Sequence, residues 1–183
     1  KRLCFVGQDT FQAGRTAAGL MGEMTGGNGQ VAIISGQVAN PGLISRQKGF
    51  TTEIKESFPG IEVVDIRYSY DDEWVASKIV EELLELYPDL TGIYITGHGV
   101  KGVCQTLQKL GKDKTMHVIA NDFLEENLKW LKEGTINFLI GQDAAVQGHS
   151  PVTILFQLLF DSKKPEKEFQ YTDIVIRTRY NMG

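Results

Sequence analysis

Short apolar runs alternate with longer amphipathic stretches along the whole chain. The runs are typical of strands and cover residues 3–9, 30–36, 61–69, 92–96, 116–122, 136–143 and 172–180. The stretches between them repeat apolar residues with the spacing of a helix. The pattern therefore predicts a strand–helix unit repeated six times and closed by a final strand.

Connections of helical length between strands predict an α/β fold with right-handed crossovers and a mostly parallel sheet covered on both faces. Residues 31–34 and 93–95 are continuously apolar, as expected for strands that are buried on both sides. The nearest thing to a linker is the short charged segment 162–168. Ligands of open α/β sheets bind at the carboxyl ends of the strands. The polar residues that follow each strand are therefore the candidates for a binding site.

Several helix boundaries carry explicit signals. Asn40 is a natural N-cap before Pro41, whose missing N–H costs nothing at the first helical position. Ser69 and Asp72 have the spacing of a capping box. Gly134 is the expected C-cap of the helix that begins near residue 123.

Length and charge narrow the class of protein. A chain of 183 residues suffices for one domain or for one and a half small lobes. The net charge of -4 and the absence of a basic run argue against a domain that itself grips nucleic acid. No apolar run reaches membrane-spanning length, and no signal peptide is visible. Because the chain opens at Lys1 almost directly on a strand pattern, we interpret it as a piece of a longer protein.

The cysteines and histidines form no metal or redox motif. Cys4 and Cys104 are far apart in the sequence, and each falls on an apolar pattern, so we expect reduced structural thiols and a cytoplasmic protein. His98, His117 and His149 lack metal-ligand spacing. We therefore expect no metal and no cofactor.

One stretch matches a cofactor motif. Gly97, Gly99 and Gly102 have the G-x-G-x-x-G spacing, and Asp122 follows at about the distance of a ribose-binding acid. Glycine is also what a tight strand-to-helix turn prefers, and this match lies in the fourth unit of the chain rather than the first. No nucleophile elbow and no P-loop is present. A nucleotide-dependent enzyme stays a remote alternative, and we expect a protein without catalytic residues.

Three polar residues near strand ends each allow two interpretations. Asp122 either caps the helix that starts at Phe123, with Glu125 completing the box, or accepts hydrogen bonds from two hydroxyls of a polyol. Arg46 is either a solvated helix residue or a rigid fork of donors for vicinal oxygens. Gln142 either caps a turn or offers a donor and an acceptor to a hydroxyl group.

Five stretches together resemble the ligand-binding domain of lactose-repressor-family regulators: VGQDTFQAGRTAA, RQKGF, VIANDF, LIGQDAAVQG and IVIRTRYN. The resemblance covers nearly the whole chain in order and spacing. It implies the three-layer αβα lobe of a periplasmic-binding-protein-like (type I) fold. Residues 1–142 would form the C-terminal lobe, residues 143–165 a crossover helix of an N-terminal lobe, and residues 166–183 the return strand and C-terminus.

The resemblance also implies roles for single residues. Arg46, before KGF, matches an arginine that binds sugar oxygens, and Asp122 matches an aspartate that accepts from sugar hydroxyls. Gln142 matches a polar residue at the last crossing between lobes, and Asp9 matches the acid at the first crossing. Thr96 stands where many members have asparagine, so that ligand contact is lost or replaced.

The resemblance therefore implies the effector-binding domain of a transcriptional regulator. A monosaccharide or related polyol would bind between two lobes and shift a hinge. Operator DNA would be bound only through a headpiece absent from this sequence, in a homodimer without membrane contact. The alternative is the sugar-binding protein of an ABC transporter, which has the same fold and site.

Overall fold

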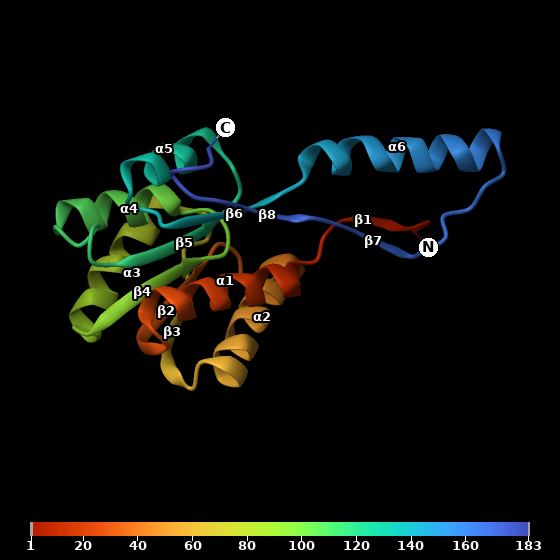
Figure 1. The fold of residues 1–183 in the computed structure, drawn as a ribbon. Coiled ribbons are helices and arrows are strands. Elements are labelled where there is room, and N and C mark those ends of the chain that lie inside the picture. Colours follow the sequence, from red (N-terminus) through yellow and green to blue (C-terminus); the bar gives the residue numbers. More distant parts are fainter. Residues whose placement is uncertain (1, 183) are drawn as a thin grey trace.

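The computed structural model describes residues 2–182, and these residues form a six-stranded main sheet with helices on both faces (Figure 1). In spatial order its strands are β3 (Gly60–Tyr68), β2 (Asn28–Ser35), β4 (Leu90–Ile95), β5 (His117–Asn121), β6 (Phe138–Gln142) and β8 (Ile174–Arg177). Neighbouring strands are parallel except for β6 and β8, which are antiparallel. The predicted α/β class, a parallel-dominated three-layer lobe, is confirmed.

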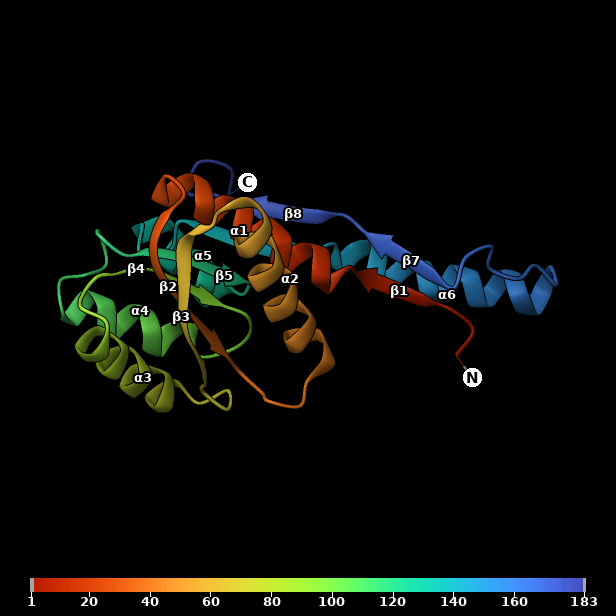
Figure 2. The ribbon, with the colours of Figure 1, turned by 90° about the horizontal axis from the view of Figure 1, so that it is seen from below.

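The helices form the two outer layers (Figures 1 and 2). One face of the sheet carries α1 (Thr10–Thr25) and α2 (Pro41–Ser57), and the other carries α3 (Glu73–Leu86), α4 (Val100–Lys109) and α5 (Glu125–Glu133). Successive residues of a strand point to opposite faces, so Ile33 joins the core under α1 and α2 while Ile34 joins the core under α3 and α4. We call the main sheet with α1 to α5 the lobe.

The expected helix ends are partly confirmed. The side chain of Asn40 accepts hydrogen bonds from two backbone N–H groups in the first turn of α2, and Gly134 ends α5 with φ 78°. The capping box of Ser69 and Asp72 is wrong. Asp72 itself caps α3, whereas the hydroxyl of Ser69 donates to the carbonyl that ends β2. The buried end of β2 offers that hydroxyl a partner that local sequence does not show.

Three elements project from the lobe, and we call them the arm: β1 (Phe5–Gln8), α6 (Ala144–Phe160) and β7 (Phe169–Thr172) (Figure 1). β1 and β7 pair with each other in a separate two-stranded parallel sheet. Among the described residues, none of α6 is buried. The chain crosses between arm and lobe after β1, after β6, and between β7 and β8.

Two elements expected from the sequence are placed differently in the structure, and both involve the arm. The pattern puts β1 in the first unit of the main sheet, within the range 1–142, but β1 pairs outside that sheet. The closing segment forms two strands, β7 and β8, rather than one. An apolar run specifies a strand but not its partner, because strand pairing is a long-range property. Residues 1 and 183 of the expected ranges lie outside the described part of the chain.

Candidate functional site

Polar groups from four elements meet at the carboxyl edge of the main sheet, where the arm joins the lobe. Arg46 comes from α2, Thr96 follows β4, Asp122 follows β5 and Gln142 ends β6. Nη1 of Arg46 donates to the carbonyl oxygen of Thr96 at 2.8 Å, and Nη2 lies 3.9 Å from Oδ1 of Asp122. Gln142 donates from Nε2 to the same carboxylate oxygen at 3.0 Å. These residues are far apart in the sequence and form one connected cluster.

Arg46 reaches this cluster because α1 and α2 pack very closely. A Cβ on Gly14 of α1 would overlap the backbone carbonyl oxygen of Arg46, and a Cβ on Gly49 of α2 would overlap the carbonyl oxygen of Phe11. The two glycines thus set the depth at which α2 lies against α1. Arg46 is only 4% exposed, so its guanidinium is held by the protein rather than solvated.

Gln8 belongs to the cluster and was missed by sequence reasoning. Its Oε1 accepts from Nη2 of Arg46 at 3.1 Å, and its Nε2 donates to the carbonyl oxygen of Gly141 at 2.9 Å. The available signal was a glutamine that ends the apolar run of β1. The neighbouring Asp9 caps α1 by accepting from the backbone N–H of Gln12 at 3.0 Å, and its expected role at the first crossing stays a prediction.

Asp122 is held in an unusual backbone conformation. Its φ of 70° lies in the left-handed region, which is strained for a residue with a side chain. Nδ2 of Asn127 donates to the carbonyl oxygens of both Asn121 and Asp122, at 3.1 and 3.0 Å. The carboxylate remains 38% exposed, so it can accept further hydrogen bonds.

The capping interpretation of Asp122 is wrong. α5 begins at Glu125, and its N-cap position is Leu124, which makes no side-chain cap. The ring of Phe123 packs on Gly141 of β6, where a Cβ would overlap it, and this contact turns the chain away from a helical start. Asp122 therefore faces the site rather than the helix.

Thr96 lies at the site, but its hydroxyl is turned inward. Its Oγ1 donates to Oγ of Ser35 at 2.9 Å, and the residue is fully buried. The carbonyl oxygen of Thr96 is the group that Arg46 uses. Thr96 therefore anchors Arg46 through its backbone instead of offering a side chain to a ligand.

Beneath the cluster lies a rigid aromatic and amide support. The ring of Tyr94 stacks on Phe50 with centroids 4.8 Å apart. Nδ2 of Asn121 donates to the hydroxyl oxygen of Tyr94 at 3.2 Å and to the carbonyl oxygen of Ile95 at 2.9 Å. Burial raises the pKa of Tyr94, against a smaller opposing effect of Arg46, so the phenol stays neutral.

The glycines of the G-x-G-x-x-G match serve the packing of α3 on α4. Gly99 stands at the N-cap of α4 with φ 96°, and a Cβ on Gly102 would overlap the carbonyl oxygen of Glu73. Oε2 of Glu73 accepts from the backbone N–H of Gly102 at 2.6 Å. A carboxylate of the chain thus occupies the helix start that a pyrophosphate would need. This geometry does not fit a dinucleotide site.

Two hollows flank the cluster. A groove of about 500 Å³ runs between the arm and the first turns of α1 and α2, and Gln8, Asp9 and Ser45 help to line it. A smaller hollow of about 80 Å³ lies between the loops that follow β4 and β5, and Asp122 lines it. The cluster can therefore present donors and acceptors to a small polar molecule at the junction of lobe and arm.

Residues 2–182 lack a metal-binding cluster and a membrane-spanning helix. This part of the chain holds no group of three His, Cys, Asp or Glu side chains able to bind a metal ion. It also has no helix that is both long and apolar enough to cross a membrane.

The chain is similar to sugar-binding proteins of transport systems. It is 25% identical over 185 residues to the D-allose-binding periplasmic protein of Escherichia coli, covering 96% of this chain and 58% of that protein. A sugar-binding protein of a sugar ABC transporter from Bacillus halodurans is 27% identical, with a TM-score of 0.94 over 99% of this chain and 66% of that one. An ABC transporter solute-binding protein from Burkholderia graminis, solved with D-arabinose, is 31% identical, with a TM-score of 0.90 over 99% of this chain and 63% of that one.

These relatives contradict the regulator hypothesis. They are transport-associated sugar-binding proteins, as the alternative had it, and not transcriptional regulators. The expected operator DNA and homodimer followed from the regulator interpretation alone and find no support in them. The relatives are named for binding sugars rather than for catalysis, which agrees with the expectation of a non-enzyme.

The relatives also bear on the expected cellular location and on how much of a longer protein this chain represents. The cytoplasmic location is not supported, since the curated relative is named as periplasmic. This chain spans 58% of the length of that relative. A family model described as a periplasmic binding protein domain matches residues 1–164. The chain belongs to the periplasmic binding protein domain family.

Proposed function

We propose that this chain supplies one side of the sugar-binding cleft of an ABC transporter's substrate-binding protein. The observation that carries the proposal is the cluster of Arg46, Asp122 and Gln142 at the carboxyl edge of the main sheet. A sugar hydroxyl both donates and accepts hydrogen bonds, and this cluster offers both kinds of group within a few ångströms.

Each residue has a distinct part in the proposed site. Asp122 is acceptor-only when ionised and takes hydrogen bonds from hydroxyls, which are strengthened by its charge. Arg46 donates to ring or hydroxyl oxygens. A guanidinium has five N–H donors, and the hydrogen bonds to Thr96 and Gln8 use only two of them, so donors remain without breaking an existing bond. Gln142 adds a donor from the crossing after β6.

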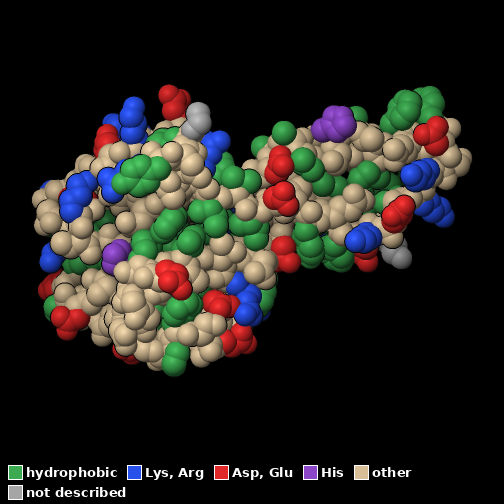
Figure 3. Space-filling model, viewed as in Figure 1, with side chains coloured by type: hydrophobic (Ala, Val, Ile, Leu, Met, Phe, Trp, Pro, Cys, Tyr) green, Lys and Arg blue, Asp and Glu red, His purple; other side chains and the backbone are tan. Residues whose placement is uncertain are grey.

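We further propose that the whole arm belongs to a second lobe, which extends the expectation for the crossover helix 143–165 to β1 and β7. The surface of the arm is unusually apolar for a surface in contact with water. Five apolar residues of α6 are all more than half exposed: Val152, Leu155, Phe156, Leu159 and Phe160. Figure 3 shows hydrophobic side chains exposed along the arm. β1, the first strand of the chain, would then be part of that second lobe as well.

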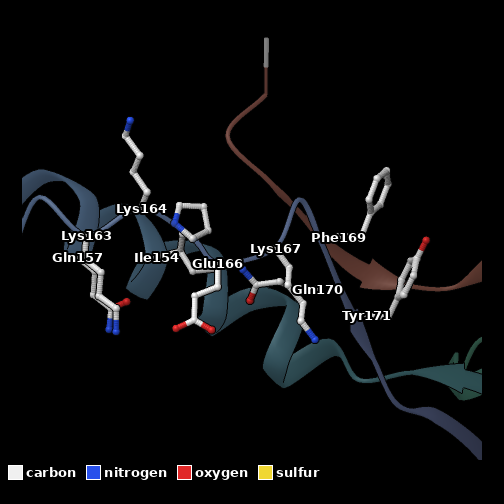
Figure 4. A pocket seen from close by; sticks show the side chains of 10 residues that line it. Ile154, Gln157, Lys163, Lys164, Glu166, Lys167, Phe169, Gln170 and Tyr171 are labelled. Atoms are coloured by element: carbon white, nitrogen blue, oxygen red, sulfur yellow. The ribbon is translucent and has the colours of Figure 1, made fainter.

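A concave surface on the arm agrees with this division. A pocket of about 540 Å³ lies between α6, the segment 163–167 and β7, with Ile154, Phe169 and Tyr171 on its walls (Figure 4). Covering this pocket and the apolar residues of α6 would complete a second lobe around the arm. A sugar at the junction of arm and lobe would then lie between two lobes. We therefore expect the 183-residue chain alone to bind sugars weakly, and sub-micromolar binding by it would contradict the two-lobe proposal.

We also propose that the protein acts outside the cytoplasmic membrane, as a transport-associated binding protein does. The support for this location is the curated relative, which is named as a periplasmic protein. Fractionation of cells that express the natural full-length protein tests this location. Recovery of the protein with the cytoplasmic fraction would contradict it.

Calorimetric titration of the natural full-length protein with D-allose and D-arabinose tests the binding function. The variant Arg46→Lys keeps a positive charge but loses the planar fork, so we expect a roughly 10- to 100-fold weaker affinity for the sugar that binds best. Arg179→Lys is the matched control, because Arg179 is exposed beyond β8 at the opposite edge of the sheet. The proposal fails if no sugar binds, or if both variants bind like the wild type.

A further inference from the structure

Two hydrogen-bonded chains connect the three crossings between lobe and arm. The first runs from Arg46 through Gln8 at the end of β1 to the carbonyl oxygen of Gly141. The second runs from Asp122 through Gln142 to Gln147, whose Nε2 donates to Oε1 of Gln142 at 3.2 Å. Both chains begin at a charged residue of the proposed sugar site.

Gln147 also reaches the third crossing. Its Nε2 donates to Oγ1 of Thr172, the last residue of β7, at 3.3 Å. Gln147 lies in the first turns of α6 and is half-buried, whereas its neighbours Val146 and Gly148 are exposed. A single amide therefore joins the crossing after β6 to the crossing after β7.

The charge of Asp122 sets the direction of the second chain. An ionised carboxylate only accepts hydrogen bonds, so Gln142 must turn its Nε2 towards Asp122. Oε1 of Gln142 then faces the opposite way and requires a donor. Gln147 supplies that donor with its Nε2, so each amide in the chain has one orientation in which every contact pairs a donor with an acceptor.

We propose that Gln147 is a positioning residue that fixes Gln142 as a hydrogen-bond donor to the ligand. This inference rests on the proposed sugar-binding function. With one N–H on Asp122 and Oε1 on Gln147, Gln142 has its second N–H left for the cleft. One ligand hydroxyl can then donate to Asp122 and accept from Gln142. This pair selects a hydroxyl over an ammonium group, which only donates, and over a carboxylate, which only accepts.

Because Gln147 and Thr172 lie in the arm, the donor geometry at the site depends on where the arm stands. A movement of the arm that separates Gln147 from Gln142 frees the Gln142 amide to turn. The contact with the sugar hydroxyl is therefore complete only in the arrangement of arm and lobe that keeps the chain of amides intact.

The variants Gln147→Glu and Gln147→Leu test the proposal in the natural full-length protein. A glutamate at 147 only accepts, so Gln142 must turn its Nε2 towards it and its Oε1 towards the carboxylate of Asp122. We expect an affinity about 10- to 100-fold weaker for the better-binding sugar of D-allose and D-arabinose. Leucine leaves Gln142 unfixed but not reversed, and we expect a smaller loss, of about 3- to 10-fold.

Gln105→Glu and Gln105→Leu are the matched controls, since Gln105 is exposed on α4 and lies far from the arm. Both should bind like the wild type. Circular dichroism and the unfolding midpoint of each variant establish that it folds. Wild-type affinity in Gln147→Glu, with sugar binding intact in the unchanged protein, would overturn the role of Gln147 and leave the proposed function standing.

A second measurement needs no ligand. The side-chain amide signals of Gln142 in a ¹⁵N-labelled protein are identified by their loss in Gln142→Leu. We expect them to shift in both Gln147 variants and to stay in place in both Gln105 variants. If no sugar binds, the binding proposal fails, and these signals alone decide whether Gln147 orients Gln142. Unshifted signals in Gln147→Glu would overturn the inference in either case.

Discussion

The lobe and the arm bury their apolar residues in different ways. The lobe encloses two cores, one on each face of the main sheet, with residues such as Phe50 and Leu83 fully buried. α6 of the arm is at least as apolar as the helices of the lobe, yet none of its described residues is buried. α6 contacts β1 on one side, and the apolar residues of its other side are exposed. An exposed apolar helix face points to a surface meant for another part of the molecule. We therefore expect the lobe to be stable by itself and the arm to need a partner surface.

Gly14→Ala should produce a large effect, because it disturbs the packing of α1 on α2 in the lobe. A methyl group at Gly14 would overlap the backbone of Arg46, so α1 and α2 must separate. We expect a loss of about 3 kcal/mol in the free energy of unfolding, measured with urea. The matched change in the arm is Gly148→Ala, which meets open space in α6 and should stabilise that helix by up to about 1 kcal/mol. Equal effects at the two positions would remove the contrast between lobe and arm.

Phe156→Ser tests whether another part of the molecule covers α6. The substitution is compared in the natural full-length protein and in the 183-residue chain. The ring of Phe156 is 54% exposed here and stacks on Phe160. In the natural full-length protein we expect a loss of roughly 2–4 kcal/mol, since a covered ring would be lost. In the 183-residue chain the same change should leave the unfolding free energy of the lobe within about 0.5 kcal/mol. An effect of the same size in both settings would mean that nothing covers α6.

Asp122→Asn separates binding from stability at the lobe's edge. The amide keeps the shape of the carboxylate, and asparagine tolerates a left-handed backbone well, so we expect a stability change below about 1 kcal/mol. Sugar affinity should fall by roughly 10-fold or more, because the charged acceptor is lost. Calorimetry of the full-length protein measures the affinity, and urea unfolding measures the stability. A large loss of stability with unchanged affinity would assign Asp122 a structural role alone.

The smallest effect concerns the two thiols. Burial raises the pKa of Cys104, with nearby glutamates acting in the same direction. The folded state therefore holds the thiol proton more tightly than the unfolded state, and Cys104 contributes stability that is lost as pH rises above the unfolded thiol pKa of about 8.5. Cys104→Ala should flatten the fall in unfolding free energy from about pH 8.5 to 10. An unchanged slope would contradict this.

Iodoacetamide labelling checks the same contrast between lobe and arm without unfolding. Cys4, just before β1, is half-buried, whereas Cys104 is fully buried in the lobe. In the folded protein we expect alkylation of Cys4 and protection of Cys104. Rapid labelling of Cys104 would mean that the α3–α4 side of the lobe opens readily.

Much of the lobe could be predicted from the sequence because its signals are local. Apolar runs gave the strands, and the caps at Asn40 and Gly134 gave two helix ends, since cap chemistry acts within one turn. Arg46, Asp122 and Gln142 could be proposed together because the carboxyl ends of parallel strands share one edge. The sequence did not show that Asp122 avoids a helix cap, because that depends on Phe123 packing on Gly141.

The rest required long-range information. The pairing of β1 with β7 joins residues from the two ends of the chain, and no local pattern specifies it. Gln8 and Gln147 look like ordinary polar residues until their amide partners are known. The distinction between a regulator and a transporter protein could not be made either, because the motifs behind the resemblance belong to a lobe of the same fold in both.

The most direct test of the central claim is a crystal structure of the natural full-length protein with the sugar that binds best. The account predicts a sugar at the carboxyl edge of the main sheet, between lobe and arm. Arg46, Asp122 and Gln142 should each lie within hydrogen-bonding distance of its oxygens. A sugar bound elsewhere, or bound here without contact to Arg46 and Asp122, would contradict the account.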